Sequence, residues 1–153
     1  MHGIWRTWMT IWCSAIIGLG AVLSGAALPA TDEGARFYFQ LISKFTSPAA
    51  IFDPPAIRLA VAVLGAVLVG WGLTMLGLVR AQNSAAQPWR SLTIAIAIWF
   101  TVDSVLSIAS GYPLNAVANV LFLATYLAPI IGSGVFVNDN SPCPDIARRV
   151  PQL

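Results

Sequence analysis

The sequence predicts an all-α, polytopic membrane protein: a bundle of four transmembrane helices with a short interfacial helix in the first loop. Hydrophobic residues make up 58% of the 153 residues, charged residues only 9%, and the mean hydropathy is +0.77. A soluble domain has about 25% charged residues, so this chain has too few charges to cover a surface exposed to water. The charged residues also cluster between long apolar runs, which is typical of membrane proteins.

Four stretches reach the length of about 20 apolar residues that a helix needs to cross the hydrocarbon core of a bilayer. We place these spans at residues 7–28, 57–79, 92–110 and 114–137 of a single transmembrane domain covering residues 1–153, followed by a polar C-terminal tail at 138–153. Peptide groups in lipid must be hydrogen-bonded within their own segment, which favours helices. A β-barrel is excluded because the apolar residues do not alternate with polar ones.

The first span has features of a secretory signal peptide, because Arg6 precedes an apolar run and residues 25–27 are small enough for cleavage. The run is nevertheless long enough to cross the bilayer, so we expect a retained signal anchor. Four tryptophans lie where the first and third spans begin and are predicted to anchor them at the membrane interface: Trp5, Trp8, Trp12 and Trp89.

The loop after the first span contains an amphipathic pattern. Phe37, Leu41 and Phe45, together with Tyr38 and Ile42, fall on one helical face. This spacing predicts a short helix over residues 34–45 that lies on the outer membrane surface.

Orientation follows from lysine and arginine, which favour the cytoplasmic side in short loops. Five basic residues fall on one side of the predicted bundle and three on the other: Arg6, Arg80, Arg90, Arg148 and Arg149 against Arg36, Lys44 and Arg58. This bias predicts that both termini are cytoplasmic in a bacterial inner (plasma) membrane.

Small residues predict where the first two spans pack, because helices in lipid associate through close backbone approach. The residues at helical spacing are Ser14, Gly18, Ala21 and Gly25 in the first span and Ala62, Ala66 and Gly70 in the second. They allow tight contact between these two helices or between protomers. The sequence leaves both alternatives open.

The third and fourth spans are joined by a turn of about three residues, so they are antiparallel neighbours. Polar and aromatic side chains line one face of each: Trp99, Asp103, Ser104 and Ser107 on the third, and Asn115, Asn119 and Tyr126 on the fourth. A central aspartate costs about 2.5 to 3.5 kcal/mol in a transmembrane helix, so we expect Asp103 to be neutral, hydrogen-bonded or hydrated. No lysine or arginine lies inside a span to pair with it, so burial is expected to favour its protonated form. It either binds a ligand or proton in a polar cavity or fastens the two helices together.

Several chemistries find no support in the sequence. The single histidine, His2, is at the N-terminus, which excludes bis-histidine haem ligation and a histidine-rich metal site. No catalytic motif, metal site or cofactor site is predicted. The net charge of +2 is too small to indicate nucleic-acid binding.

Three short motifs resemble those of a group of small bacterial four-helix membrane proteins, more distantly similar to the DoxX-like and BphX-like families. They are Val69-Gly70-Trp71, Trp99-Phe100-x-x-Asp103-Ser104-x-x-Ser107 and Gly111-x-x-x-Asn115-x-x-x-Asn119, in the last two-thirds of the chain. The resemblance implies a four-helix membrane fold. Such families have no settled activity, so it implies no function.

Two functional hypotheses follow. The first is a non-enzymatic interaction or accessory subunit in the lipid bilayer, self-associating as a homo-oligomer or joining other membrane subunits through its small-residue faces. The second is a binder or transporter of a lipid, a small apolar molecule or a proton, with a polar intramembrane pocket around Asp103.

Overall fold

The computed structural model describes residues 3–46, 49–81 and 86–136. Its elements in chain order are α1 (Ile4–Ser24), η1 (Gly25–Ala27), α2 (Glu33–Ile42), η2 (Ala49–Phe52), α3 (Pro55–Arg80), α4 (Ala86–Ala109) and α5 (Pro113–Gly132). Within the described residues, α1, α3, α4 and α5 are each long and apolar enough to cross a membrane. The predicted all-α bundle is therefore confirmed, whereas the predicted tail at 138–153 lies outside the described residues.

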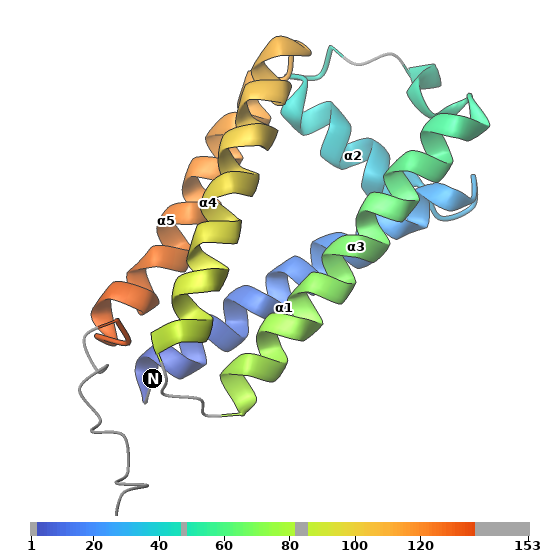
Figure 1. Ribbon diagram of the computed structural model, residues 1–153. Helices are drawn as coiled ribbons and strands as arrows, with labels where there is room; N and C mark the ends of the chain where they lie inside the picture. The colour runs from blue at the N-terminus through green and yellow to red at the C-terminus, as the bar shows by residue number, and fades with distance from the viewer. Residues whose placement is uncertain (1–2, 47–48, 82–85, 137–153) are drawn as a thin grey trace, which may run out of the picture.

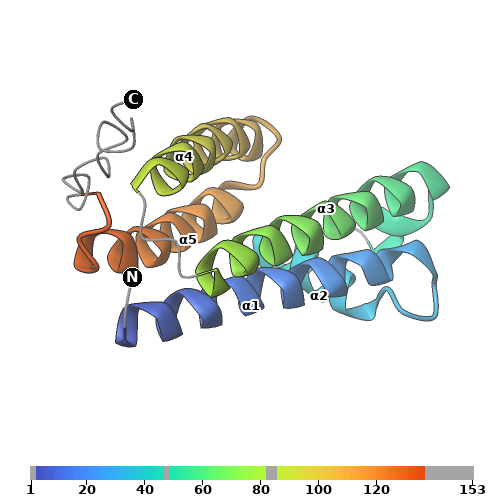
Figure 2. The ribbon, with the colours of Figure 1, turned by 60° about the horizontal axis from the view of Figure 1, so that its bottom comes forward.

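The long helices form two antiparallel pairs, α1 with α3 and α4 with α5 (Figure 1). The pairs approach each other at the end of the bundle that holds the N-terminus, where α1 contacts α5. They separate toward the opposite end, where α2 lies across the space between them (Figure 1). Figure 2 shows the same division from another side, with α1 and α3 running together and apart from α4.

Glycines bring the backbones of α1 and α3 into direct contact. A Cβ atom added at Gly65 would lie 2.4 Å from the backbone nitrogen of Ser24 and 2.5 Å from the carbonyl oxygen of Gly20. A Cβ atom added at Gly20 would lie 2.6 Å from the carbonyl oxygen of Gly65. Further along the pair, Gly72 packs on Cys13 and Ile17. Side chains are excluded from this contact because the helices touch at main-chain atoms.

The structure corrects the predicted packing face of α1 and α3. Of the seven small residues predicted there, Ser14, Gly18, Ala21, Ala66 and Gly70 are exposed, Ala62 is half-buried, and Gly25 faces the loop at Thr31. Gly18 and Gly70 would have no neighbour within 4 Å of an added Cβ atom. Each helix has small residues at helical spacing on two faces. The face that contains Gly20 on α1, and the face that contains Gly65 and Gly72 on α3, make the contact between the helices. Association between protomers through the exposed face stays a prediction.

Two of the tryptophans predicted as interfacial anchors are buried in the protein: Trp12, which joins α1 to α5, and Trp89 of α4. Trp12 is buried, its ring centroid lies 5.3 Å from those of Phe122 and Tyr126, and its indole nitrogen donates a hydrogen bond to the Phe122 carbonyl. Trp89 is only 1% exposed. The anchor prediction is therefore wrong for Trp12 and Trp89, because an indole that supplies core packing does not reach the lipid headgroups.

The other two tryptophans also contact α5. Trp8 donates a hydrogen bond to the Thr125 carbonyl but remains 43% exposed. Trp5 packs closely on Gly132. The helical spacing of the tryptophans thus marks a face of α1 that packs on protein.

Helix α2 closes the wide end of the bundle. Its apolar residues divide between two faces instead of sharing one as predicted. Phe37 and Leu41 are exposed, whereas Ile42 is buried and Tyr38 is half-buried toward the bundle. The chain then adopts positive φ at Phe45, which is also exposed. Helix α2 can carry two apolar faces because one face covers the space between the helix pairs, while the other lies on the surface of the protein.

A cluster of charges that the sequence analysis did not identify fixes the start of α2. The carboxylate of Asp32 accepts hydrogen bonds from Arg36 at 2.9 Å and from Arg58, at the start of α3, at 2.6 Å. Arg58 also donates to the carbonyl of Ala26 in η1, and the Arg36 guanidinium lies over the Phe52 ring. Hydrogen bonds from Arg36 and then Arg58 lower the pKa of Asp32 below its usual 3.8. The cluster therefore joins α2 to α3.

Candidate functional site

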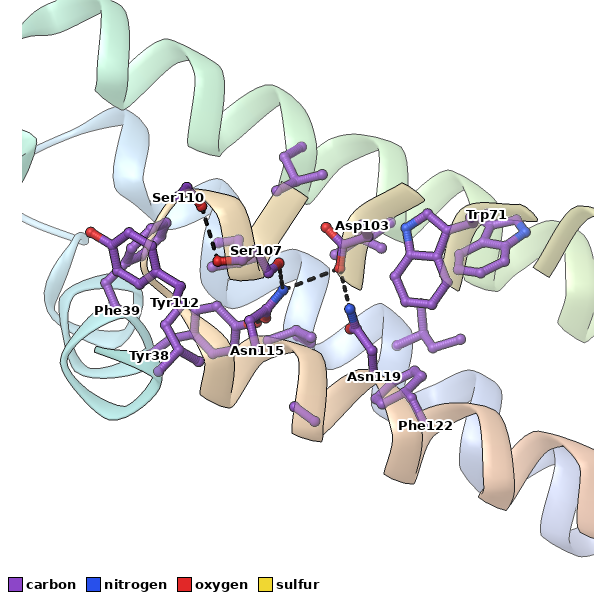
Figure 3. Close-up of a pocket in the computed structure, with 18 residues that line it drawn as sticks. Tyr38, Phe39, Trp71, Asp103, Ser107, Ser110, Tyr112, Asn115, Asn119 and Phe122 are labelled. Atoms are coloured by element: carbon purple, nitrogen blue, oxygen red, sulfur yellow. Dashed lines mark hydrogen bonds between the residues drawn. The ribbon is translucent and has the colours of Figure 1, made fainter. Parts of the chain in front are cut away.

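A cavity of about 390 Å³ lies between the two helix pairs, beneath α2 (Figure 3). It is lined by Ile16, Leu19, Leu23, Tyr38, Phe39, Ile42, Leu64, Leu68, Trp71, Trp99, Asp103, Ser107, Ser110, Tyr112, Asn115, Ala118, Asn119 and Phe122. Five elements contribute, α1 to α5. The volume falls within the range of about 300 to 1,000 Å³ typical of small-molecule sites, and the mostly apolar wall with a few polar groups is equally typical.

The polar wall of the cavity centres on Asp103 in α4. Oxygen Oδ2 of Asp103 accepts a hydrogen bond from the amide nitrogen of Asn119 at 2.5 Å and a second from that of Asn115 at 3.1 Å (Figure 3). Both amides come from α5, one helical turn apart, so they face the same point on α4. The carboxylate is thereby held in one position by two neutral donors.

The hydrogen-bond network around Asp103 includes side chains of α2, α4 and α5. The amide nitrogen of Asn115 also donates to the Ser107 hydroxyl at 2.8 Å, and that of Asn119 donates to the Ser104 hydroxyl at 3.3 Å. The Tyr38 hydroxyl of α2 donates to the carbonyl oxygen of Asn115 at 2.7 Å. Burial raises the pKa of Tyr38, and the nearby charge of Asp103 raises it further. Tyr38 therefore stays protonated and acts as a donor that ties α2 to the network.

Two oxygen atoms on this wall are potential hydrogen-bond acceptors for a bound molecule. Among the described residues, no group donates a hydrogen bond to Oδ1 of Asp103 or to the side-chain carbonyl of Asn119. Asn119 is only 6% exposed, and both residues line the cavity. Buried polar atoms nearly always have a partner, so the cavity presents two acceptors that a bound molecule could satisfy.

The cavity reaches the surface on the side between α3 and α4. Leu64 of α3 is 50% exposed and Ser110, at the end of α4, is exposed, yet both line the cavity. The two helices contact each other at Trp71 and Trp99, whose ring centroids are 5.6 Å apart. Leu64 lies within a helix that is long and apolar enough to cross a membrane, whereas Ser110 directly follows the end of α4. The remaining sides are covered by α2 and by the core around Trp12.

The structure brings together six of the seven residues that the sequence singled out for this site. Asp103, Asn115, Asn119 and Ser107 line the cavity and share hydrogen bonds, Trp99 lines it, and Ser104 accepts from Asn119. Tyr126 is the exception, because it packs on Trp12 and its hydroxyl shares a hydrogen bond with Thr93. Tyr126 is therefore not part of the cavity wall, although the sequence placed it on the same face as Asn115 and Asn119. Whether the other six bind a ligand or proton stays a prediction.

Sequence reasoning missed the contributions of α1, α2 and α3 to the cavity. Tyr38 was assigned to the membrane surface, and its spacing gave no indication that it reaches α5. Trp71 and Leu68 come from a uniformly apolar helix, where no pattern distinguishes a cavity wall from a lipid-facing side chain. These residues could be found only from the structure, which shows how helices that are far apart in the sequence pack together.

The lining offers little for metal or covalent chemistry. Within the described residues, no three His, Cys, Asp or Glu side chains gather, and Asp103 is the one acidic residue in the lining. What the wall can do is accept hydrogen bonds at a carboxyl group, in a cavity that aromatic side chains also line. These properties suit binding.

The chain matches no family model, no curated protein and no solved structure. The resemblance to DoxX-like and BphX-like proteins accordingly stays a prediction.

Proposed function

We propose that the protein is a non-enzymatic binder of a small, mostly apolar molecule, which it holds in the cavity between its helix pairs. The observation that carries this proposal is the cavity of about 390 Å³, whose apolar wall is interrupted by one carboxylate fixed between two asparagine amides. Apolar area supplies the affinity for such a ligand, and the few polar groups set its orientation. The excess of arginine in the N-terminus, the 80–91 region and the tail supports placement in a bacterial inner membrane with both termini cytoplasmic.

The arrangement favours binding because its polar groups are positioned before a ligand arrives. Asn115 and Asn119 orient Asp103, and Tyr38 orients Asn115. Less conformational freedom is then lost on binding, which increases affinity. A network serving only to join α4 to α5 does not require an adjoining cavity or two acceptors without donors.

Filling the cavity provides the test. Ala118 lines the cavity on α5, whereas Ala124 on the same helix is exposed. The protein is purified in lipid nanodiscs, and the hydrophobic molecules bound to it are identified by native mass spectrometry. We expect Ala118→Phe to lose a bound species that the unaltered chain and Ala124→Phe retain. An identical set of bound species in all three proteins would contradict the proposal.

A second candidate function, self-association as an accessory subunit, is favoured by the exposed small residues. Gly18 of α1 and Gly70 of α3 have open space around them, and Ser14, Ala21 and Ala66 are also exposed. Such faces allow close approach of helices in lipid. Gly18→Leu and Gly70→Leu should reduce the dimer fraction in analytical ultracentrifugation in a mild detergent. A protein that is monomeric without substitution would remove this candidate.

A further inference from the structure

We infer that the ligand is a lipophilic amine, which enters from the bilayer and places its protonated nitrogen against Asp103. This inference rests on the proposed binding function and specifies its ligand class. It draws on the charge of the cavity, on its unpaired acceptors, on its aromatic residues and on its side opening.

Among the described residues, no cationic side chain pairs with Asp103. Both ion pairs in the described residues involve Asp32 at the α2 end, and the partners of Asp103 are neutral amides. No lysine or arginine is among the residues that line the cavity. A carboxylate removed from water is strongly stabilised by a cation, and an ammonium ligand would supply one. An anionic ligand would instead be repelled.

The free acceptors of the cavity favour a ligand that donates hydrogen bonds. Oδ1 of Asp103 and the carbonyl oxygen of Asn119 both accept hydrogen bonds, and no described residue donates to either. A primary ammonium carries three N–H donors and no acceptor, so one nitrogen could satisfy both oxygens. A hydroxyl group carries one donor and could satisfy only one of them.

Aromatic rings adjoin the carboxylate. Trp99 lies one helical turn before Asp103 on α4, and its ring contacts Trp71 of α3. Trp71 and Asp103 both line the cavity (Figure 3). Indole faces attract cations, and tryptophan does so more strongly than other aromatic residues. A cavity lined by one carboxylate and two indoles is a suitable environment for an alkylammonium head.

The route to the cavity suits a molecule dissolved in lipid. The opening at Leu64 and Ser110 lies between two membrane-spanning helices, while α2 covers the end of the bundle. An amine with a long alkyl chain partitions into the bilayer with its charged group near the headgroups. It can then pass sideways between α3 and α4 without crossing the packed core.

Three probes with the same alkyl chain test the head group: decylamine, decanol and decyl sulfate. The full chain in nanodiscs is titrated with each, tryptophan fluorescence reports binding, and empty nanodiscs correct for partitioning into lipid. We expect decylamine to bind more tightly than decanol by about tenfold or more, the effect of a close charge pair, and decyl sulfate to bind weakest. Equal affinity for decylamine and decanol would overturn the assignment of an amine.

Two variants test whether the tighter binding of decylamine depends on Asp103. Asp103→Asn keeps the shape and an acceptor but removes the charge, so decylamine should lose its advantage over decanol. Asp53→Asn, at an exposed acid outside the cavity, should change neither affinity. If decanol binds and Ala118→Phe abolishes its binding while the head groups are not distinguished, the amine is ruled out and the proposed binding function stands. If no probe binds, both are overturned. The three-probe comparison on the unaltered chain decides the ligand class even if Asp103→Asn fails to fold.

Discussion

The two helix pairs of this protein are held together by different means. In α1 and α3, Gly20 and Gly65 bring main-chain atoms into contact and leave no room for a side chain. In α4 and α5, a carboxylate on one helix accepts hydrogen bonds from two amides on the other. Because burying apolar surface gains little in lipid, helices there associate by close packing or by polar contacts, and this chain uses one for each pair.

The difference matters for the cavity. Close packing fills the space between helices, so the α1–α3 pair forms a continuous apolar wall. Polar contacts place charged and hydrogen-bonding atoms on the facing wall, at Asp103 and Asn119. Under the proposed function, the first pair provides rigidity and the second provides recognition. This comparison makes separate predictions for the two pairs.

The largest expected effect is in the α1–α3 pair. Gly65→Ala places a Cβ atom against backbone atoms of Ser24 and Gly20, which cannot move without separating the helices. Overpacking of this kind costs about 1 to 3 kcal/mol or more, and we expect a corresponding loss of unfolding free energy in mixed detergent. Gly70→Ala in the same helix has open space and should change stability by less than about 0.5 kcal/mol. Similar losses in both variants would contradict the glycine contact.

A smaller loss is expected when the α4–α5 network is broken. Asn119→Leu removes a donor to Asp103, and hydrogen bonds in membrane proteins contribute about 0.6 to 1.7 kcal/mol. Replacing both partners with apolar residues is often nearly neutral, so Asp103→Leu together with Asn119→Leu should be less destabilising than the sum of the single changes. The measurement is a double-mutant cycle of unfolding free energies, and strict additivity would show that these residues are not coupled.

A still smaller loss of stability is expected when the hydrogen bond from α2 to the Asp103 network is removed. Tyr38→Phe removes the hydrogen bond to Asn115, so we expect a loss of about 0.5 to 1.5 kcal/mol together with faster amide hydrogen exchange in α2. Tyr112→Phe is the matched control, because among the described residues its hydroxyl group makes no side-chain hydrogen bond. Equal exchange rates in the two variants would mean that Tyr38 does not hold α2 in place.

Sequence reasoning reached the architecture and most of the polar cluster because both follow from local chemistry. Apolar runs long enough to span a bilayer indicate helices, and a short turn makes α4 and α5 neighbours, so Asp103, Asn115 and Asn119 had to lie near one another.

The parts that failed depend on which faces of distant helices meet. Gly18 and Gly20 are equally small, but only Gly20 contacts α3. Trp12 has the spacing of an interfacial residue yet packs against α5, and Tyr126 points to Thr93 instead of Asp103. Periodicity defines the faces of a helix without stating which neighbour covers each one.

The smallest expected effect is at the charge cluster that joins α2 to α3. Water reaches Arg36, whose side chain is 32% exposed, and screens its pair with Asp32, although Arg58 and Asp32 are themselves only 14% and 7% exposed. The pKa of Asp32 is lowered below 3.8 in the folded protein, so its stabilisation is present above that pH and is lost as the pH falls through the folded value. Melting temperature measured from about pH 6 to about pH 2 should therefore fall at the acidic end. Asp32→Asn should flatten this dependence, whereas Glu33→Gln, at the exposed neighbouring residue, should preserve it. Identical profiles in the two variants would show that other acids control the acid sensitivity, and that the charge cluster adds little to the apolar contacts of α2 at Ala35 and Phe39.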